Sequence, residues 1–198
     1  MKTYPFNALV SRMKYIRRWS LMHAARPETL SEHTAETAIL APHPVPDRAA
    51  GHRHSGAPRD RGRGRVVSDA PEILTGDMPT PVKIQNERIH TAYKALETES
   101  AVAMLGLFAA RPAPAYGRLC DRPHPHRGRV PPFKAADRLS ALIKCIEEVQ
   151  AGNREFAAAL EQQKTALAAM HCPEADYFLE RMLPCYSQNL DELTQTGD

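Results

Sequence analysis

Apolar residues spaced three and four positions apart in the C-terminal third restrict the possible folds of this chain more than any other feature of its sequence. The pattern is formed by Leu139, Leu142, Ile143, Ile146 and Val149. Because an α-helix turns once in about 3.6 residues, these side chains share one face of a helix. Gly152 and Asn153 follow directly and are typical of a helix C-terminus. The sequence therefore predicts a helix that buries one side against other elements.

The same spacing recurs along most of the chain, and no segment alternates apolar and polar residues as a half-buried strand does. Ser31 is a good residue to cap a second helix, and the segment 69–83 resembles a helix end followed by a Gly/Pro loop. The sequence predicts further helices over 6–19, from 31 onward, and over 86–107, 154–170 and 174–195. We therefore expect an all-α fold.

Two windows, residues 41–65 and 111–132, lack the helical pattern. Between them they hold ten of the seventeen prolines and five of the nine histidines. In the first window Val45 is the only Leu, Ile, Val, Met or Phe residue. Without apolar side chains a segment has no face to bury, so we expect both windows to be irregular and exposed.

The excess of basic over acidic residues also lies in these two windows. The net charge is +3, but six Arg against two Asp in residues 40–65, and five Arg against one Asp in 111–132, supply +8. The rest of the chain is therefore at −5. The run Arg61–Arg65 could form a basic arm for nucleic acid, but no aromatic residue interleaves it, so we do not expect a nucleic-acid partner.

Composition places the chain among soluble proteins with one globular domain, since 42% of residues are hydrophobic and 25% are charged. No run approaches the roughly 18 to 20 apolar residues that span a bilayer. Residues 1–20 are too polar and basic for a signal peptide, so we expect a cytoplasmic protein without a membrane partner. The four cysteines form no C-x-x-C pair, so we expect free thiols.

Three features could carry chemistry. These are His33 in a Ser-Glu-His run, Asp69 with Glu72 one helical turn later, and Asp137 in a Lys-Ala-Ala-Asp-Arg run. Histidine and carboxylates drawn from separate helices can converge on one divalent metal and leave positions open for water and phosphate. Each feature is weak when taken singly, because a lone histidine or a helical Asp is usually structural or solvent-exposed.

Taken in order, these segments resemble one family, the bacterial HD-domain 5'-deoxynucleotidases. The resemblance is carried by RRWSLM at 17–22, LSEH at 30–33, DAPEILTGDMPTPVK at 69–83, KAADRLSALIKCIEE at 134–148, AGNREF at 151–156 and DYFLERMLPCYSQNLDE at 176–192. The TGDMPTPVK run is its most specific part.

The resemblance implies an all-α HD-domain helical bundle that forms a homodimer. It also implies hydrolysis of deoxynucleoside 5'-monophosphates with a divalent cation such as cobalt or manganese. The metal ligands would be His33, Asp69 and Asp137. Ser68 stands where the family motif has a further histidine. We therefore expect weak metal binding and low activity, and the alternative is a catalytically inactive HD-domain protein that binds nucleotides.

Four further roles follow from the same resemblance. Arg18 would hold the phosphate with its planar guanidinium, and Trp19 would pack on the nucleoside. Glu72 would act beside Asp69 in catalysis as the group that transfers a proton. Asp77 would approach the sugar, and together with Trp19 it would exclude a 2'-hydroxyl group.

We interpret the chain as a single domain over residues 1–198 with frameshifted stretches at about 40–66 and 108–132. The family fold needs buried helices at both places, and each window begins and ends sharply. The genetic code permits this reading, since His43–Arg48 can be encoded so that a one-base shift gives Thr-Leu-Cys-Leu-Ile. The alternative is a divergent lineage in which long insertions replace the helices.

Overall fold

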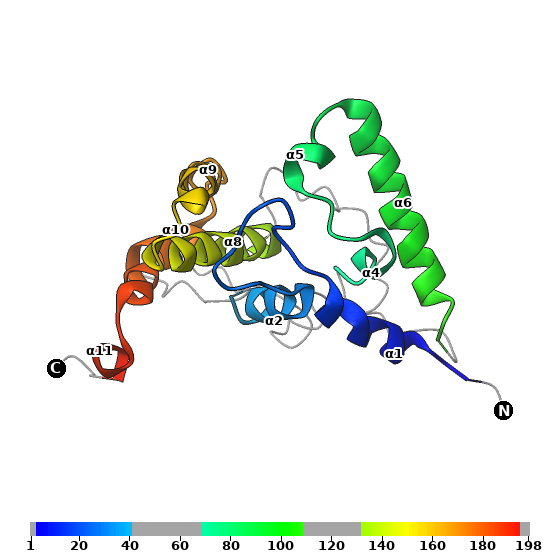
Figure 1. The fold of residues 1–198 in the computed structure, drawn as a ribbon, viewed down its shortest axis with the longest axis horizontal. Coiled ribbons are helices and arrows are strands. Elements are labelled where there is room, and N and C mark those ends of the chain that lie inside the picture. The colour runs from blue at the N-terminus through cyan, green and yellow to red at the C-terminus, as the bar shows by residue number, and fades with distance from the viewer. Residues whose placement is uncertain (1–2, 41–68, 109–131, 195–198) are drawn as a thin grey trace, which may run out of the picture.

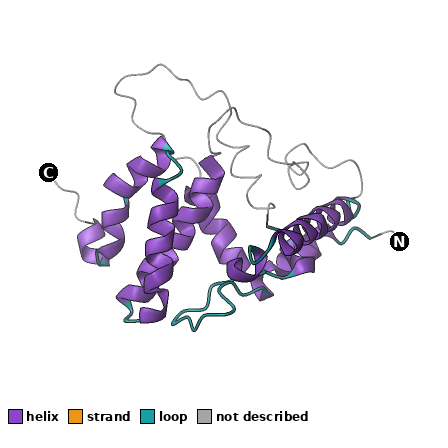
Figure 2. Cartoon of the chain, turned by 90° about the horizontal axis from the view of Figure 1, so that it is seen from above, coloured by secondary structure: helices purple, strands orange, loops and turns teal. Residues whose placement is uncertain are grey.

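The computed structural model describes residues 3–40, 69–108 and 132–194. In these ranges every regular element is helical, and the one β-bridge joins Arg17 to Thr29 (Figures 1 and 2). The elements are α1 (Phe6–Val10), η1 (Ser11–Tyr15), α2 (Leu30–Leu40), α4 (Glu72–Thr75), α5 (Thr80–Lys83), α6 (Glu87–Leu105), α8 (Pro132–Gln150), η2 (Arg154–Phe156), α9 (Ala157–Ala168), α10 (Pro173–Arg181), η3 (Leu183–Ser187) and α11 (Leu190–Thr194). The all-α prediction is confirmed.

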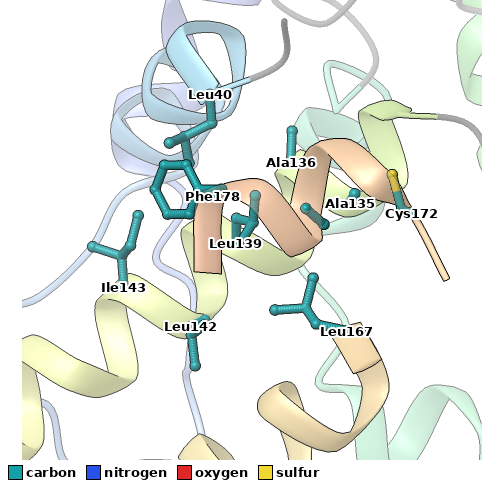
Figure 3. Close-up of a cluster of buried hydrophobic side chains, with 10 residues drawn as sticks. Leu40, Ala135, Ala136, Leu139, Leu142, Ile143, Leu167, Cys172 and Phe178 are labelled. Atoms are coloured by element: carbon teal, nitrogen blue, oxygen red, sulfur yellow. The ribbon is translucent and has the colours of Figure 1, made fainter. Parts of the chain in front are cut away.

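Helix α8 is the centre of the larger core and packs against α2, α9 and α10 (Figure 1). Its side chains Leu139, Leu142 and Ile143 are buried together with Leu167 from α9 and Phe178 from α10 (Figure 3). The buried face is the one that the apolar spacing predicts. The same helix carries the central polar residues of the candidate site on another side.

A smaller second core joins the N-terminal elements to the middle of the chain. Phe6 of α1, Met13 of η1 and Leu30 of α2 are buried against Ala70 and Met104. This cluster brings the segment that precedes α4 close to the start of α2. Leu30 at the start of α2 belongs to this cluster and Leu40 at its end belongs to the larger one, so the helix contributes to both cores.

The first turn of α2 is closed by Thr29 rather than by Ser31, which corrects the expected start of this helix. The Thr29 hydroxyl accepts from the backbone N–H of Glu32 at 3.3 Å, and the Glu32 carboxylate accepts from the Thr29 N–H at 2.7 Å. This reciprocal pair is a capping box, and it satisfies two N–H groups that the helix leaves unpaired. Asn86 caps α6 in the same way, by accepting from the N–H of Ile89.

Several expected helix ends are wrong by a few residues or more. The N-terminal helix is α-helical only to Val10, continues as a 3-10 turn and ends at Tyr15. The expected helix over 174–195 is divided into α10, η3 and α11, because Pro184 interrupts its middle. The expected helix end in 69–83 is the short helix α4, and the expected Gly/Pro loop after it contains the short helix α5. Gly152, at φ 86°, ends α8 as predicted.

The predictions for the two proline-rich windows lie outside the described residues, as does Ser68. This also holds for the frameshift interpretation and for the expected exposure of these segments. Among the described helices, none is long and apolar enough to cross a membrane.

Candidate functional site

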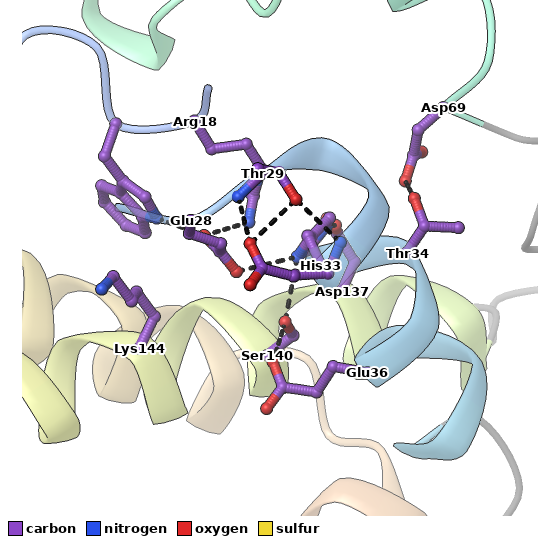
Figure 4. Close-up of polar contacts among 12 residues, drawn as sticks. Arg18, Glu28, Thr29, His33, Thr34, Glu36, Asp69, Asp137, Ser140 and Lys144 are labelled. Carbon is purple, nitrogen blue, oxygen red and sulfur yellow. Dashed lines mark hydrogen bonds and ion pairs between the residues drawn. The ribbon is translucent and has the colours of Figure 1, made fainter. Parts of the chain in front are cut away.

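His33 is buried where α2 crosses α8, and its ring is held on both nitrogens (Figure 4). The Nε2 atom lies 2.9 Å from Oδ1 of Asp137, and the Nδ1 atom lies 2.9 Å from Oγ of Ser140. Asp137 and Ser140 are three residues apart on α8, so both reach the same ring from one face of that helix. Two of the three expected metal ligands are therefore in direct contact.

The hydrogen bonds of Ser140 determine which nitrogen of the His33 ring can bind a cation. The Ser140 hydroxyl donates its only proton to the carboxylate of Glu36. Its oxygen must then accept from Nδ1–H of His33. This leaves Nε2, the nitrogen 2.9 Å from Oδ1 of Asp137, as the ring atom that a cation can bind.

Asp69 contacts α2 at Thr34, the residue that follows His33. The hydroxyl of Thr34 donates to Oδ2 of Asp69 at 3.1 Å (Figure 4). The third expected ligand thus lies beside the residue that follows His33. In the part of the chain that the structure describes, no three His, Cys, Asp or Glu side chains gather closely enough to hold a metal ion by themselves.

Arg18 and Trp19 meet at a single carboxylate, that of Glu28. Nη1 of Arg18 donates to Oε2 of Glu28 at 3.0 Å, and Nε1 of Trp19 donates to the same oxygen at 2.8 Å. The other oxygen, Oε1, lies 3.8 Å from Nδ1 of His33. The Trp19 ring also packs on Phe156, with ring centroids 5.3 Å apart. No pattern or motif in the sequence marks Glu28, so its role could not be predicted from the residues alone.

Glu72 and Asp77 lie in the same electrostatic environment, at the α4 side of the site. Burial, together with the negative charges of Asp69 and Asp77, raises the pKa of Glu72 to about 8 against the opposing effect of Lys83 and Arg18. Burial also raises the pKa of Asp77, while Arg18 lowers it. The expected catalytic and sugar-binding carboxylates therefore share one neighbourhood with Arg18.

The turn that carries Asp77 is fixed from α6. Gly76 has a φ of 74°, a conformation that favours glycine, and its carbonyl accepts from the Tyr93 hydroxyl at 3.0 Å. Lys83 of α5 lies 4.5 Å above the Tyr93 ring and pairs with Glu97 at 2.8 Å. Helix α6 thus positions the TGDMPTPVK segment.

The loop between η1 and α2, which carries Arg18 and Trp19, is tied to the end of α8 by buried Glu148. The Glu148 carboxylate accepts from the backbone N–H of Ala25 at 2.7 Å and of Arg26 at 3.0 Å. Lys144 and Asn153 donate to it as well. Burial alone would raise the pKa of Glu148, but these donors lower it to about 2. The i, i+4 spacing of Lys144 and Glu148 was the signal that could have indicated this pair.

Residues 5–186 of the chain match the family described as 5'-deoxynucleotidase YfbR-like. A 5'-deoxynucleotidase of Erwinia tasmaniensis is 36% identical over 190 residues, which cover 96% of each chain. The 5'-deoxynucleotidase YfbR of Shigella dysenteriae is 36% identical over 198 residues, or 98% of each chain.

Two solved structures have the same fold. An HD-domain phosphohydrolase from Listeria innocua superposes with a TM-score of 0.69 at 18% identity, covering 93% of this chain and 89% of the other. A cyanophage S-2L HD phosphohydrolase, solved with dA and one catalytic Zn2+ ion, superposes with a TM-score of 0.57 at 19% identity, covering 92% and 96%. At such identities the likeness establishes the HD-domain helical fold.

Proposed function

The chain belongs to the YfbR-like 5'-deoxynucleotidase family, and from this we propose that it is a metal-dependent phosphohydrolase converting deoxynucleoside 5'-monophosphates to deoxynucleoside and phosphate. The observation that carries the proposal is the hydrogen-bonded cluster at α2 and α8. In it the His33–Asp137 pair and the Arg18–Trp19 pair are joined through Glu28. A metal-binding group and an anion-binding group next to each other suit the hydrolysis of a phosphate ester.

The donor set fits a divalent transition metal. His33 offers Nε2, while Asp137 and Asp69 offer carboxylate oxygens from other elements, and imidazole with carboxylate suits such ions. We propose cobalt or manganese as the cation, and the cyanophage relative was solved with zinc. When bound, the cation would lower the pKa of a water molecule and neutralise phosphate charge.

Arg18 and Trp19 would hold the substrate. Arg18 uses one terminal nitrogen for Glu28, and its guanidinium has further N–H donors for phosphate oxygens. The Trp19 indole keeps its N–H on Glu28, which leaves the ring available to pack against a nucleoside. The phosphate would then lie between Arg18 and the His33–Asp137 pair.

Glu72 would move the proton. In the hydrolysis the oxygen of water bonds to phosphorus, the bond between phosphorus and O5' breaks, and the leaving oxygen takes up a proton. Because the pKa of Glu72 is raised to about 8, its carboxyl group carries a proton at neutral pH and can donate it. Asp69 would stand beside it as a metal ligand, and Asp77 with Trp19 would exclude a 2'-hydroxyl group.

Ser68 determines how well this chain performs the reaction. A neutral hydroxyl is a poorer transition-metal ligand than imidazole, so a site with Ser68 in the histidine position has three protein ligands and lower affinity. We propose weak metal binding and low turnover for the chain as written. The protein would act in the cytoplasm as a homodimer.

The test compares the wild-type chain with Ser68→His, using cobalt and dAMP. We expect cobalt affinity to rise at least about tenfold in the variant, because imidazole restores a fourth ligand. Turnover of dAMP should rise with it unless the two proline-rich windows also limit activity. High wild-type turnover that the substitution leaves unchanged would contradict the proposed role of this position.

Cobalt-dependent phosphate release separates this proposal from its rival, a catalytically inactive nucleotide-binding HD protein. An inactive protein would bind dAMP without hydrolysing it at any cobalt concentration, in both the wild type and Ser68→His. A low but cobalt-dependent release of phosphate in the wild type supports the enzyme.

A further inference from the structure

Glu28 occupies a central position that no motif assigns to it. Its carboxylate is 8% exposed, lies in the loop just before α2, and faces three residues of the proposed site. One oxygen accepts from both Arg18 and Trp19, and the other lies 3.8 Å from His33 (Figure 4). A buried carboxylate is costly to desolvate unless it is paired and hydrogen-bonded, and here its partners are site residues.

The backbone at Trp19 gives a second, independent observation. Trp19 has a φ of 60°, a left-handed conformation that is strained in a residue other than glycine. Such a conformation persists only where the surroundings fix it. Here Glu28 contributes twice, since its side chain accepts from the indole N–H and its carbonyl accepts from the Arg18 N–H at 3.0 Å.

We propose that Glu28 is a positioning residue. It holds the Arg18 guanidinium and the Trp19 indole in place beside His33 before the substrate binds. This inference rests on the proposed function for its effect on catalysis. Its structural part, the fixing of Trp19, does not depend on that function. Glu28 acts through Arg18, Trp19 and His33, and it does not itself touch the reacting atoms.

A carboxylate is needed here, rather than any side chain of the same size. Oε2 of Glu28 accepts from both Arg18 and Trp19, and Oε1 lies 3.8 Å from Nδ1 of His33, whose proton Ser140 accepts. In Glu28→Gln the amide would either turn its NH2 group toward the Arg18 and Trp19 donors or keep its oxygen on them without the negative charge. Either orientation weakens the hold on both residues at almost unchanged volume, so the substitution separates charge and acceptor geometry from volume.

The experiment uses tryptophan emission, because Trp19 is the only tryptophan in the chain. In the metal-free protein we expect Glu28→Gln to shift the Trp19 emission maximum to longer wavelength as the indole loses its buried partner. Glu155→Gln is the matched control, since Glu155 holds the same loop through the His23 N–H but touches neither Arg18 nor Trp19. Its emission should match the wild type.

The kinetic arm measures dAMP hydrolysis with cobalt. We expect Glu28→Gln to raise the KM for dAMP about tenfold, a usual effect of losing a charge-assisted hydrogen bond, and to change kcat less than about threefold. Glu28→Asp keeps the charge and should recover part of the KM loss and of the emission shift. If Glu28→Gln does not fold, Glu28→Asp carries the test with smaller changes in the same directions.

Two results would overturn the positioning role. One is wild-type emission in both Glu28 variants, and the other is a lower KM in Glu28→Gln, which would mean that Glu28 competes with phosphate for Arg18. If the wild type releases no phosphate from dAMP, the proposed function fails, while the emission arm still decides whether Glu28 holds Trp19.

Discussion

The two sides of the candidate site hold their charged groups in different ways. On the α2–α8 side, His33 is bonded through both ring nitrogens, and Glu28 is bonded to Arg18 and Trp19. On the α4 side, Glu72 lies near Asp69 and Asp77, and their like charges together with burial raise its pKa to about 8. On the first side donors meet most of the carboxylates, although burial and the charge of Glu28 raise the pKa of Glu36, and on the second side the carboxylates repel one another.

This difference indicates a division of labour. A fully hydrogen-bonded network holds donors in fixed positions, which suits metal ligands and phosphate-binding groups. Carboxylates that raise one another's pKa hold a proton near neutral pH, which suits proton transfer. Substitutions on each side test this division of labour.

Asp137→Asn, on the α2–α8 side, should have the largest effect on turnover and metal affinity. The substitution keeps the shape but removes the negative charge beside Nε2 of His33. We expect dAMP turnover to fall about 1000-fold and cobalt affinity to fall at least about 100-fold, which exceeds the usual loss from an outer-shell partner. Titration calorimetry with cobalt and a phosphate-release assay measure both. Asp176→Asn, on the exposed face of α10, is the control, and cobalt affinity unchanged in Asp137→Asn would contradict the assignment.

Glu148→Gln should destabilise the loop that carries Arg18 and Trp19. The substitution leaves the Lys144 ammonium buried without its carboxylate, and breaking a buried pair costs about 3 kcal/mol in the free energy of unfolding. Because the folded pKa of Glu148 is lowered to about 2, its contribution is complete above the usual 4.5 and is lost as pH falls between those values.

Urea unfolding at neutral and at acid pH measures this effect. Glu161→Gln breaks an exposed pair with Lys164 and should cost less than about 0.5 kcal/mol. Equal losses in Glu148→Gln and Glu161→Gln would show that the loop does not depend on the buried pair.

Glu72→Gln should have the smallest effect on stability and the opposite pH dependence. The folded pKa of about 8 lies above the usual 4.5, so the folded chain keeps a proton that the unfolded chain loses. Stability of the metal-free wild type should therefore fall as pH rises from about 4.5 to 8, lowering the melting temperature on the order of 10 °C. Calorimetry at pH 5 and pH 8 should show this drop in the exposed control Glu99→Gln and a smaller one in Glu72→Gln. Identical drops in the melting temperature of Glu99→Gln and Glu72→Gln would contradict the raised pKa of Glu72, and with it the electrostatic contrast between the two sides.

The sequence by itself determined most of the helices, because helical periodicity and caps depend on residues a few positions apart. The stripe from Leu139 to Val149 predicted the face of α8 that is buried, and Asn86 and Gly152 mark helix ends where expected. The family motifs also selected His33 and Asp137, which the structure brings into contact. Ser68 and the two proline-rich windows stay predictions.

Only the tertiary structure decided which polar groups hold the site together. Both Thr29 and Ser31 can cap a helix, and the burial of Leu30 with the Leu30 N–H to Ile16 carbonyl bond selects Thr29. Glu148 reaches Ala25 across 123 positions of the chain, and Glu28 gathers Arg18, Trp19 and His33 only after the loop folds back on α2. Such contacts follow from chain closure and packing, to which the local spacing of residues gives no guide.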